Sequence, residues 1–252
     1  MENLFSVKDK VAVVTGAGRG LGFVYARALL QFGAKVVICD LVPEQVEQAV
    51  SELKAYGNVE GHAVNVAVEQ EVRDFAKRVI ERHGQVDILV NNAGVVQRVA
   101  TANMDAAEWE RVMGVNLRGT FLCCRYFGEH MRSRKKGKIV NIASIAGVKA
   151  MDLRLAYCTS KAGVIQLTRT LAMEWGPDNI QVNAIGPGYI KTKMNEDLRS
   201  DPVRYQQMVS EIPLGRFGEP EDLIGTLIYL VSPASDYVTG QTIFVDGGVI
   251  TH

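Results

Sequence analysis

The feature that most constrains the fold of this sequence is a regular alternation of short β-branched runs with longer amphipathic stretches. The short runs are rich in valine and isoleucine and have the length of strands. They cover residues 11–15, 35–39, 61–64, 86–90, 138–142, 181–184 and 242–245. Because they alternate with helical stretches, the pattern predicts an α/β fold, a doubly wound parallel sheet of about seven strands with helices on both faces.

Between these runs, apolar residues recur at three- and four-residue intervals, which is typical of a helix with one buried face. The expected helices cover residues 21–31, 43–55, 69–82, 107–131, 155–175 and 220–231. No repeat or Pro/Ser-rich linker divides the chain, and one α/β domain can hold its 252 residues. We therefore expect a single domain over 1–252, in which the segment 191–220 has no clear periodicity and is a candidate lid.

The charge balance narrows the class of partner. The chain carries 28 lysine and arginine residues and 28 aspartate and glutamate residues, so it has no net field of either sign. We expect neither nucleic acid nor a membrane as a partner, and a small molecule as the ligand. The apolar runs are shorter than the ~20 residues that a membrane span needs, and the first residues do not resemble an export signal.

Cysteines and histidines are scattered without the spacing of a metal site or a disulfide framework. The cysteines are Cys39, Cys123, Cys124 and Cys158, and the histidines are His62, His83, His130 and His252. We expect reduced thiols that are buried or incidental, and no metal. Free thiols fit a cytoplasmic location.

A glycine-rich turn follows the first predicted strand. Gly16, Gly20 and Gly22 give the spacing TGxxxGxG, and Leu21 stands where a GxGxxG pattern would place its last glycine. Glycines let the backbone approach a pyrophosphate, and the N-terminus of the next helix supplies N–H donors and a positive dipole end. We interpret the segment as a phosphate-binding turn, with a tight turn that binds nothing as the alternative.

Asp40 ends the second predicted strand, about 20 residues beyond the glycine turn. A carboxylate at this place accepts hydrogen bonds from an adenosine ribose diol and repels a 2′-phosphate, so it favours NAD over NADP. Arg19 is the opposing signal, because a guanidinium beside the turn can bind a 2′-phosphate. An arginine there can equally lie in solvent or contact the pyrophosphate, and the sequence therefore favours NAD.

Tyr157 and Lys161 lie near the start of the expected helix 155–175. Their four-residue spacing places both side chains on one helix face. A tyrosine hydroxyl has a pKa near ~10, so it needs a nearby cation to exchange a proton at neutral pH. Lys161 can supply that cation, and the pair is a candidate acid/base.

Two other segments end at the same edge of the predicted sheet. The strand 138–142 runs into Ser144, whose hydroxyl can polarise a substrate carbonyl. Asn92, Ala93 and Gly94 follow the strand 86–90, at the place where a dinucleotide crosses the sheet. We expect these three residues to form part of a cofactor wall.

Taken in order, these motifs resemble those of the short-chain dehydrogenases/reductases. They are TGxxxGxG, NNAG at 91–94, Asn116, Ser144, YxxxK at 157–161 and Pro187-Gly188. The resemblance covers essentially the whole chain. It implies a Rossmann-type dinucleotide-binding oxidoreductase acting on alcohols or ketones, and it implies a homotetramer.

The resemblance also implies roles for individual residues. Tyr157 exchanges the substrate proton, Ser144 positions the carbonyl oxygen, and Lys161 tunes Tyr157 and holds the nicotinamide ribose. Asn116 completes a water-mediated proton relay, unless it is a structural asparagine that satisfies backbone groups inside a helix. Both roles of Asn116 can coexist.

Further cofactor contacts come from the same resemblance. Besides Gly16, Gly20, Gly22, Asp40, Asn92, Ala93, Gly94, Tyr157 and Lys161, they are Arg19, Leu21, Leu41, Asn65, Val66, Pro187, Gly188, Ile190 and Thr192. Ile190 and Thr192 are expected at the nicotinamide carboxamide. Asn65 stands where family members usually carry aspartate beside the adenine, and an amide can also face the adenine edge.

Substrate contacts are expected from the loop after Gly94, the segment after Ser144 and the candidate lid. Arg98 and Arg154 can each clamp a substrate carboxylate through a planar guanidinium, and a solvated surface arginine is the alternative. The segments 183–189 and 213–218 resemble family members that oxidise sugar acids, the gluconate 5-dehydrogenases and 2-deoxygluconate 3-dehydrogenases. The same segments resemble 3-oxoacyl carrier-protein reductases, which usually take NADP.

Two rival interpretations come from other classes. A non-catalytic dinucleotide sensor can keep this fold, because fold does not fix function, but it has no need of Ser144, Tyr157 and Lys161 together. A metal-dependent dehydrogenase needs ligand spacing that the histidines and cysteines lack. The sequence therefore predicts a metal-free oxidoreductase whose preferred substrate is a sugar acid or polyol.

Overall fold

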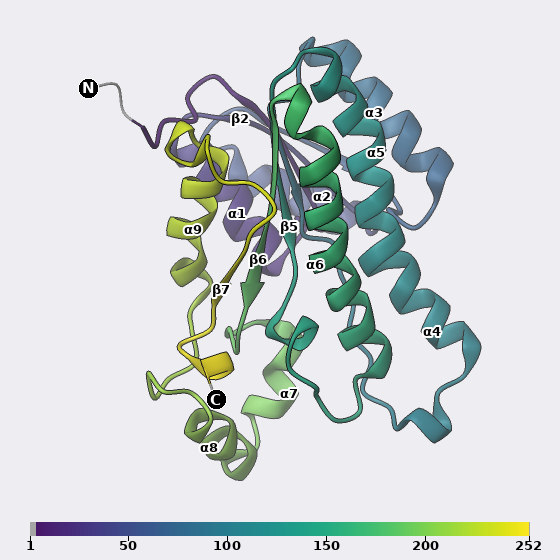
Figure 1. Cartoon of the computed structure of the whole chain (residues 1–252), viewed down its shortest axis with the longest axis vertical. Helices are drawn as coiled ribbons and strands as arrows, with labels where there is room; N and C mark the ends of the chain where they lie inside the picture. The colour runs from purple at the N-terminus through teal and green to yellow at the C-terminus, as the bar shows by residue number, and fades with distance from the viewer. Residues whose placement is uncertain (1–3, 252) are drawn as a thin grey trace.

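The computed structural model describes residues 4–251, which form one parallel sheet with helices on both sides (Figure 1). The seven strands lie in the order β3-β2-β1-β4-β5-β6-β7, and every neighbouring pair is parallel. Their bounds are β1 Val11–Thr15, β2 Lys35–Asp40, β3 Val59–Ala63, β4 Ile88–Asn91, β5 Gly137–Ile142, β6 Ile180–Pro187 and β7 Thr242–Val245. The predicted doubly wound α/β fold is confirmed. Residues 1–3 and His252 of the predicted domain lie outside the described residues.

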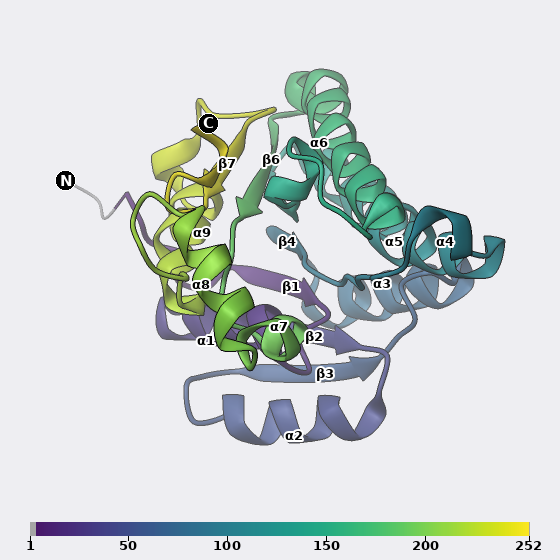
Figure 2. The ribbon, with the colours of Figure 1, turned by 90° about the horizontal axis from the view of Figure 1, so that it is seen from below.

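Two layers of helices cover the two faces of the sheet (Figure 2). One layer holds α1 (Gly20–Gln31), α2 (Pro43–Leu53) and α9 (Ile224–Val231), and the other holds α3 (Glu69–His83), α5 (Gly119–Ser133) and α6 (Leu155–Trp175). The short helices α7 (Glu196–Arg199) and α8 (Pro202–Ser210) lie at the end of the sheet nearest the viewer in Figure 2. The strand order reverses between β1 and β4, and in open α/β sheets ligands bind beyond the strand carboxyl ends at that point.

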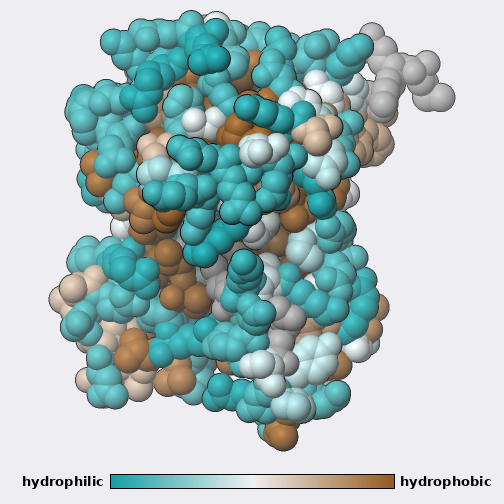
Figure 3. Space-filling model, turned by 180° about the vertical axis from the view of Figure 1, so that it is seen from behind, coloured by the Kyte–Doolittle hydropathy of each residue, from teal (hydrophilic) through white to brown (hydrophobic). Residues whose placement is uncertain are grey.

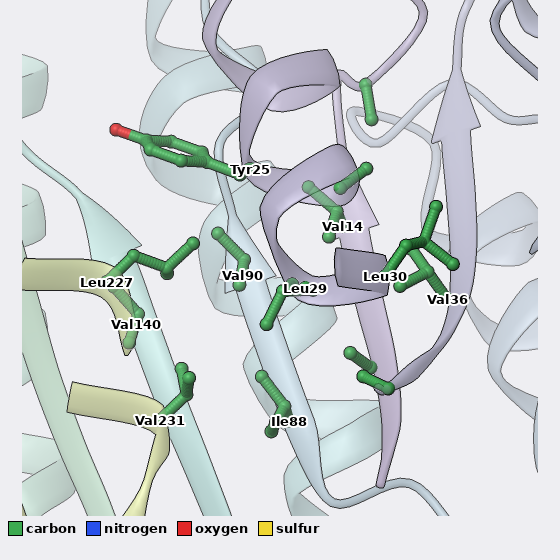
Figure 4. Close-up of a cluster of buried hydrophobic side chains, with 14 of the residues drawn as sticks. Val14, Tyr25, Leu29, Leu30, Val36, Ile88, Val90, Val140, Leu227 and Val231 are labelled. Carbon is green, nitrogen blue, oxygen red and sulfur yellow. The ribbon is translucent and has the colours of Figure 1, made fainter. Parts of the chain in front are cut away.

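Buried apolar side chains fix the sheet to each helix layer. On one face, Leu29 of α1 and Leu227 of α9 pack over Val140 and its neighbours in the sheet (Figure 4). On the other face, Phe75 of α3 and Phe127 of α5 meet edge-on with ring centroids 5.5 Å apart. Each fully buried side chain of this size contributes about 1.5–3 kcal/mol. The strand ends that carry the polar residues therefore sit on a rigid base.

The outer surface seen from behind is mostly hydrophilic, with apolar residues interspersed (Figure 3). Ion pairs join neighbouring elements, as where Arg27 of α1 meets Glu221 of η6 (Pro220–Leu223) at 2.7 Å. Such exposed pairs contribute about 0–1 kcal/mol each. Over the described part of the chain, none of the helices is both long and apolar enough to cross a membrane.

The expected helix 107–131 is interrupted in the structure. It consists of α4 (Ala106–Met113), a π-helical turn η2 (Gly114–Arg118) and α5. The π turn contains Asn116, whose buried side chain hydrogen-bonds to another loop and not within its own helix. Single π turns inside helices occur frequently at functional sites. Apolar periodicity does not report this interruption, because both flanking helices keep the same buried face.

Several other boundaries differ from the predictions. The third strand begins two residues earlier, at Val59, and the sixth extends to Pro187 because it pairs with strands on both sides. The fourth begins at Ile88, two residues later than expected. The candidate lid 191–220 contains α7 and α8, and α9 begins after the turn η6. Short helical turns are η1 Thr101–Asn103, η3 Ile145–Gly147, η4 Gly176–Asp178, η5 Lys193–Asn195, η7 Pro233–Ser235 and η8 Val249–Thr251.

Candidate active site

The turn between β1 and α1 requires glycine at two positions. Gly16 has φ +63°, and a Cβ there would lie 2.6 Å from the Cα of Ala93. A Cβ on Gly22 would lie 2.3 Å from the carbonyl oxygen of Gly16. Both contacts are with backbone atoms, which cannot move aside cheaply. The turn therefore packs closely against the segment that follows β4, which contains Ala93 of the predicted cofactor wall.

The Asn92 side chain fixes this turn by hydrogen bonds. Its Nδ2 donates to the carbonyl oxygens of Thr15 and Gly16 at 3.0 and 2.9 Å. In return, the Thr15 hydroxyl accepts from the backbone N–H groups of Asn92 and Ala93 at 3.1 and 3.0 Å. These four bonds fix the β1–α1 turn to the β4 end at the point where the strand order reverses. Thr15 was not singled out from the sequence, although it opens the TGxxxGxG motif.

The start of α1 offers a cradle for phosphate. Gly20 has φ +61°, and a Cβ built on it meets nothing within 4 Å among the described residues. α1 begins at Gly20, and within the described part of the chain the exposed Arg19 side chain makes no capping hydrogen bond to it. The first N–H groups of a helix have no partner within the helix and carry the positive end of its dipole, and half-buried Leu21 lies in this first turn. The residues fit a dinucleotide pyrophosphate.

Asp40 lies at the carboxyl end of β2 and faces the glycine turn. Its Oδ2 accepts from the Gly18 N–H at 2.9 Å, and its Oδ1 accepts from the Leu41 N–H at 2.7 Å. Two backbone bonds thus fix the carboxylate beside the place where an adenosine ribose would lie. Leu41 is exposed and can cover an adenine ring.

Asn65 and Val66 follow β3 at the same edge of the sheet. The Asn65 Oδ1 accepts from the Ala67 N–H at 3.0 Å, so the side chain caps its own turn. Val66 is buried, and a Cβ on Gly119 of α5 would lie 2.9 Å from its Cγ2. In this arrangement Asn65 shapes the loop, and its contact with the adenine remains a prediction.

Tyr157 and Lys161 lie on one face of α6, as their spacing predicts. The Lys161 Nζ is 5.8 Å from the centre of the Tyr157 ring and donates to the Ile142 carbonyl oxygen at 2.7 Å. Lys161 is only 4% exposed, and this burial lowers its pKa to about 8. Gly94 lies beside it, since a Cβ there would be 3.6 Å from Nζ. The Lys161 side chain thus lies between α6 and the predicted cofactor wall.

Ser144 and two arginines act on the Tyr157 hydroxyl. Burial raises the pKa of Tyr157, and a hydrogen bond from Ser144 and the charges of Arg154 and Arg98 oppose that rise. The Ser144 Oγ also accepts from the Ala146 N–H at 3.1 Å, which fixes its position at the start of η3. The Lys161 ammonium, which the sequence predicts to lower this pKa, donates to a backbone carbonyl in the structure, and its effect on Tyr157 remains a prediction. The free protein therefore holds a protonated phenol next to Ser144.

Asn116 connects the cofactor wall to α6. Its Oδ1 accepts from the Val95 N–H at 2.8 Å, and its Nδ2 donates to the Val95 carbonyl at 2.9 Å. The same Nδ2 donates to the Ser160 Oγ at 3.0 Å, and Ser160 donates to the carbonyl oxygen of Tyr157 at 2.7 Å. Ser160 was not anticipated from the sequence. The side chain of Asn116 has a structural role, and the relay role remains a prediction.

The residues after β6 lie at the same edge. Gly188 donates to the Val245 carbonyl oxygen at 3.0 Å, and a Cβ on it would lie 2.5 Å from the Cα of Asp246. Pro187 ends the strand, and buried Ile190 bridges to Gly218. The Thr192 N–H donates to the Asn195 Oδ1 at 3.2 Å, which begins the helical part of the lid.

The two candidate substrate arginines lie in different surroundings. The Arg98 Nη1 donates to the Asp197 Oδ2 at 3.0 Å, so this guanidinium joins the loop after Gly94 to the lid helix α7. Arg154 is half-buried at the start of α6. Both charges reach Tyr157, because both act on its pKa. The pairing of Arg98 with Asp197 was not foreseen, since 99 positions separate them in the sequence.

Fold and site together define the class of this protein: an α/β oxidoreductase with a dinucleotide-binding turn at the switch point of its sheet. A family model described as enoyl-(acyl carrier protein) reductase matches residues 16–250. The chain belongs to this family, the short-chain dehydrogenases/reductases. The predicted membership and the predicted enzyme class are both confirmed.

Relatives with assigned activities span the whole chain. The 5-keto-D-gluconate 5-reductase of Escherichia coli is 37% identical over 251 residues, which are 99% of both chains. The 3-oxoacyl-[acyl-carrier-protein] reductase of Thermotoga maritima is 36% identical over 246 residues, 97% of this chain and 99% of the relative. Both predicted substrate classes are therefore represented among proteins similar to this one.

Solved structures are similar over the same length. The crystal structure of a putative gluconate dehydrogenase from Agrobacterium tumefaciens has a TM-score of 0.96 and 39% identity, and 99% of each chain is covered. A putative NAD(P)-dependent gluconate 5-dehydrogenase from Beutenbergia cavernae, with NADP bound at low occupancy, has a TM-score of 0.95 and 35% identity. That match covers 99% of this chain and all of the other. The family thus supports a nicotinamide dinucleotide without deciding between NAD and NADP.

Proposed function

We propose that this chain is an NAD(H)-dependent oxidoreductase that transfers a hydride between the nicotinamide and a secondary alcohol or ketone. The observation that carries the proposal is the meeting of Ser144, Tyr157 and Lys161 beside the glycine turn at the switch point of the sheet. When bound, the nicotinamide would accept or supply the hydride at the carbinol carbon. The residues of this chain would handle the proton.

Tyr157 is the proposed general acid and base. In the reducing direction its half-buried phenol donates a proton to the carbonyl oxygen, and in the oxidising direction the phenolate takes the hydroxyl proton. The Ser144 Oγ, held by the Ala146 N–H, is placed to donate to the oxygen that carries the developing charge. We propose that Lys161 binds the nicotinamide ribose and that its charge favours the phenolate.

NAD is the proposed cofactor, because the Asp40 carboxylate is fixed by two backbone N–H groups where a 2′-phosphate would have to lie. Asp40→Asn, which removes the charge but keeps an acceptor oxygen, should raise the kcat/KM ratio of NADP to NAD roughly 10–100-fold, since like charges in contact cost several kcal/mol. Arg19→Ala is the control for the opposing cation and should lower NADP use. An unchanged ratio in Asp40→Asn would contradict the assignment to NAD.

A sugar acid or polyol is the proposed substrate. The charges of two guanidinium groups, those of Arg98 and Arg154, lower the pKa of Tyr157, and either group can bind a carboxylate. Arg98→Ala and Arg154→Ala should each raise KM for D-gluconate roughly tenfold or more, because a hydrogen bond to a charged group contributes about 1.5–3 kcal/mol. KM for an uncharged polyol should change little.

Asp197→Ala separates substrate binding by Arg98 from its pairing with the lid. This variant keeps the Arg98 guanidinium but removes its 3.0 Å partner, so KM for D-gluconate should stay the same or fall. Arg27→Ala, which removes an ion pair distant from the site, is the matched arginine control. Equal rises in KM for the acid and the polyol would rule out a carboxylate clamp.

A panel of sugar acids, polyols, hydroxysteroids and acyl thioesters, each assayed with NAD and NADP, tests the whole proposal. The alternative activity is that of a 3-oxoacyl carrier-protein reductase or another carbonyl reductase, and turnover of thioesters with NADP would favour it. Absence of turnover on every class together with tight NADH binding would favour a non-catalytic dinucleotide sensor. We expect the highest kcat/KM for a sugar acid with NAD.

We further propose that the chain works as a homotetramer in the cytoplasm. A groove with a cavity of about 580 Å³ lies between α4, α5 and α6, and Met113, Leu117, Phe121 and Leu167 line it. Phe121 is 42% exposed, which favours cover by another copy of the chain. The four cysteines are free thiols, which fits a reducing compartment.

A further inference from the structure

Gln97 is a buried polar residue that neither the motifs nor the proposed chemistry uses. It lies in the loop after the NNAG segment and is 4% exposed. Its Oε1 accepts from the backbone N–H of Tyr157 at 3.1 Å, across 60 positions of sequence. Its Nε2 is buried and finds no hydrogen-bond partner among residues 4–251. A buried amide with an unsatisfied donor is costly, so its presence calls for a specific role.

The N-terminus of α6 depends on this contact. The first N–H groups of a helix have no partner within the helix, and a side-chain acceptor must satisfy them. Arg154 occupies the capping position, but within the described part of the chain its side chain makes no capping bond. The Tyr157 N–H is one of these groups, and the Gln97 Oε1 satisfies it. Gln97 therefore caps the catalytic helix from a different loop.

The carbonyl group of Tyr157 is held as well. The Ser160 hydroxyl donates to it at 2.7 Å, and Ser160 in turn accepts from Asn116. Asn116 binds both backbone groups of Val95, two residues before Gln97. Side chains thus bind both polar backbone groups of Tyr157, and both are tied to the loop 95–97. A bond between backbone groups, from the Val99 N–H to the Leu153 carbonyl at 3.0 Å, also joins the continuation of this loop to the residues before α6.

We propose that Gln97 is a positioning residue, which holds the first turn of α6 so that the Tyr157 hydroxyl meets Ser144 and the substrate oxygen. The inference rests on the proposed role of Tyr157 as acid/base. Gln97 acts through the Tyr157 backbone and through the loop 95–97, which follows the predicted cofactor wall. Displacement of a reacting group by about 1 Å can cost about 10²-fold in rate, so a single cap can have a large effect on turnover.

Gln97→Met tests this with a side chain of similar length that lacks both polar atoms. The Tyr157 N–H loses its acceptor and the unsatisfied Nε2 disappears, so the two effects on stability oppose one another and Tm should stay within about 3 °C of wild type. We expect kcat for D-gluconate with NAD to fall on the order of 10–100-fold. KM for NAD should change less than about twofold, because the glycine turn and Asp40 are untouched.

Gln97→Glu is the conservative rescue. It keeps an acceptor for the Tyr157 N–H, and a carboxylate at a helix N-terminus near Arg98 and Arg154 is favourably placed. We expect kcat of this variant to lie within about threefold of wild type, well short of the roughly 10²-fold loss that displacement of Tyr157 would cause. Gln48→Met, on the exposed face of α2, removes a glutamine that bonds only at the surface and should behave as wild type.

Hydrogen exchange measures the capping bond without any substrate. The Tyr157 amide should exchange slowly in wild type and Gln97→Glu and at least about tenfold faster in Gln97→Met, since the bond to Gln97 protects it. Unchanged exchange, equal loss of kcat in the Met and Glu variants, or a fall in kcat matched by an equal fall in NADH binding and Tm would each overturn the inference. If Tyr157→Phe keeps full activity, the proposed function fails. If Tyr157→Phe is inactive while Gln97→Met turns over normally, only the inference about Gln97 fails.

Discussion

Tyr157→Phe is expected to lower kcat by about 10³-fold, the range in which loss of a general acid/base falls, while NADH still binds. The change removes only the hydroxyl, whose pKa Ser144 affects, and leaves the ring beside Lys161. Loss of the interactions of one hydroxyl costs about 1 kcal/mol, so the variant should remain folded. Steady-state kinetics with the best substrate of the panel, NADH fluorescence titration and thermal unfolding give the three readouts.

Tyr126→Phe is the matched control. Its hydroxyl donates to the Glu69 Oε1 at 2.7 Å on the outer side of α5, away from Ser144. It should lose a similar amount of stability and keep its kcat. Full activity in Tyr157→Phe, or equal loss of activity in both variants, would contradict the assignment of Tyr157 as the acid/base.

The parts of the site that sequence could predict are those set by local geometry. The four-residue interval between Tyr157 and Lys161 places them together on any α-helix, and the structure does so. Gly16 is required by a positive φ and by backbone contact, which only glycine tolerates. Asp40 follows from the rule that parallel strands end at one sheet edge.

The parts that sequence missed depend on contacts between distant segments. Gln97 caps a helix that begins 58 positions later, and Arg98 pairs with Asp197 in a segment whose pattern predicted no structure. The π turn at Asn116 is fixed by bonds to the loop at Val95. Residue propensity and apolar periodicity do not predict these contacts. Each contact depends on how two loops, distant in sequence, come together once the sheet has formed.

The orientation of the Lys161 side chain is another feature that the sequence does not predict. Four-residue spacing places a lysine near a tyrosine, but it does not give the direction of the ammonium group. In the structure that group donates to the Ile142 carbonyl, and burial dominates its own pKa. The charge that acts on Tyr157 in the free protein comes from Arg98 and Arg154, and these residues also define the expected substrate. If the proposed clamp is correct, one pair of arginines affects both the pKa of Tyr157 and the choice of substrate.

Lys161→Met should lower kcat at least about 10²-fold, because the proposed acid/base loses the nearby cation that favours its phenolate form. It should also stabilise the free protein at neutral pH. Burial lowers the pKa of Lys161 from 10.5 to about 8, so below pH 8 the folded chain carries a buried cation that the unfolded chain solvates better. A shift of this size corresponds to about 3 kcal/mol, and loss of the bond to Ile142 offsets about 1 kcal/mol of it.

The pH dependence gives this gain a distinct signature. The unfolded chain binds a proton at Lys161 more tightly than the folded chain, so wild-type stability relative to Lys161→Met rises as pH increases from about 8 to 10.5. The advantage of Lys161→Met, measured by urea unfolding, should be full below pH 8 and should disappear before pH 10.5, where only the lost bond to Ile142 remains. Lys77→Met is the control, because Lys77 is exposed on α3 and pairs with Glu81 at 3.8 Å, so its loss should change stability by less than about 1 kcal/mol at any of these pH values and leave kcat unchanged. A Lys161→Met variant that is less stable than wild type at neutral pH, or that keeps full activity, would show that this buried cation serves the fold and not the reaction.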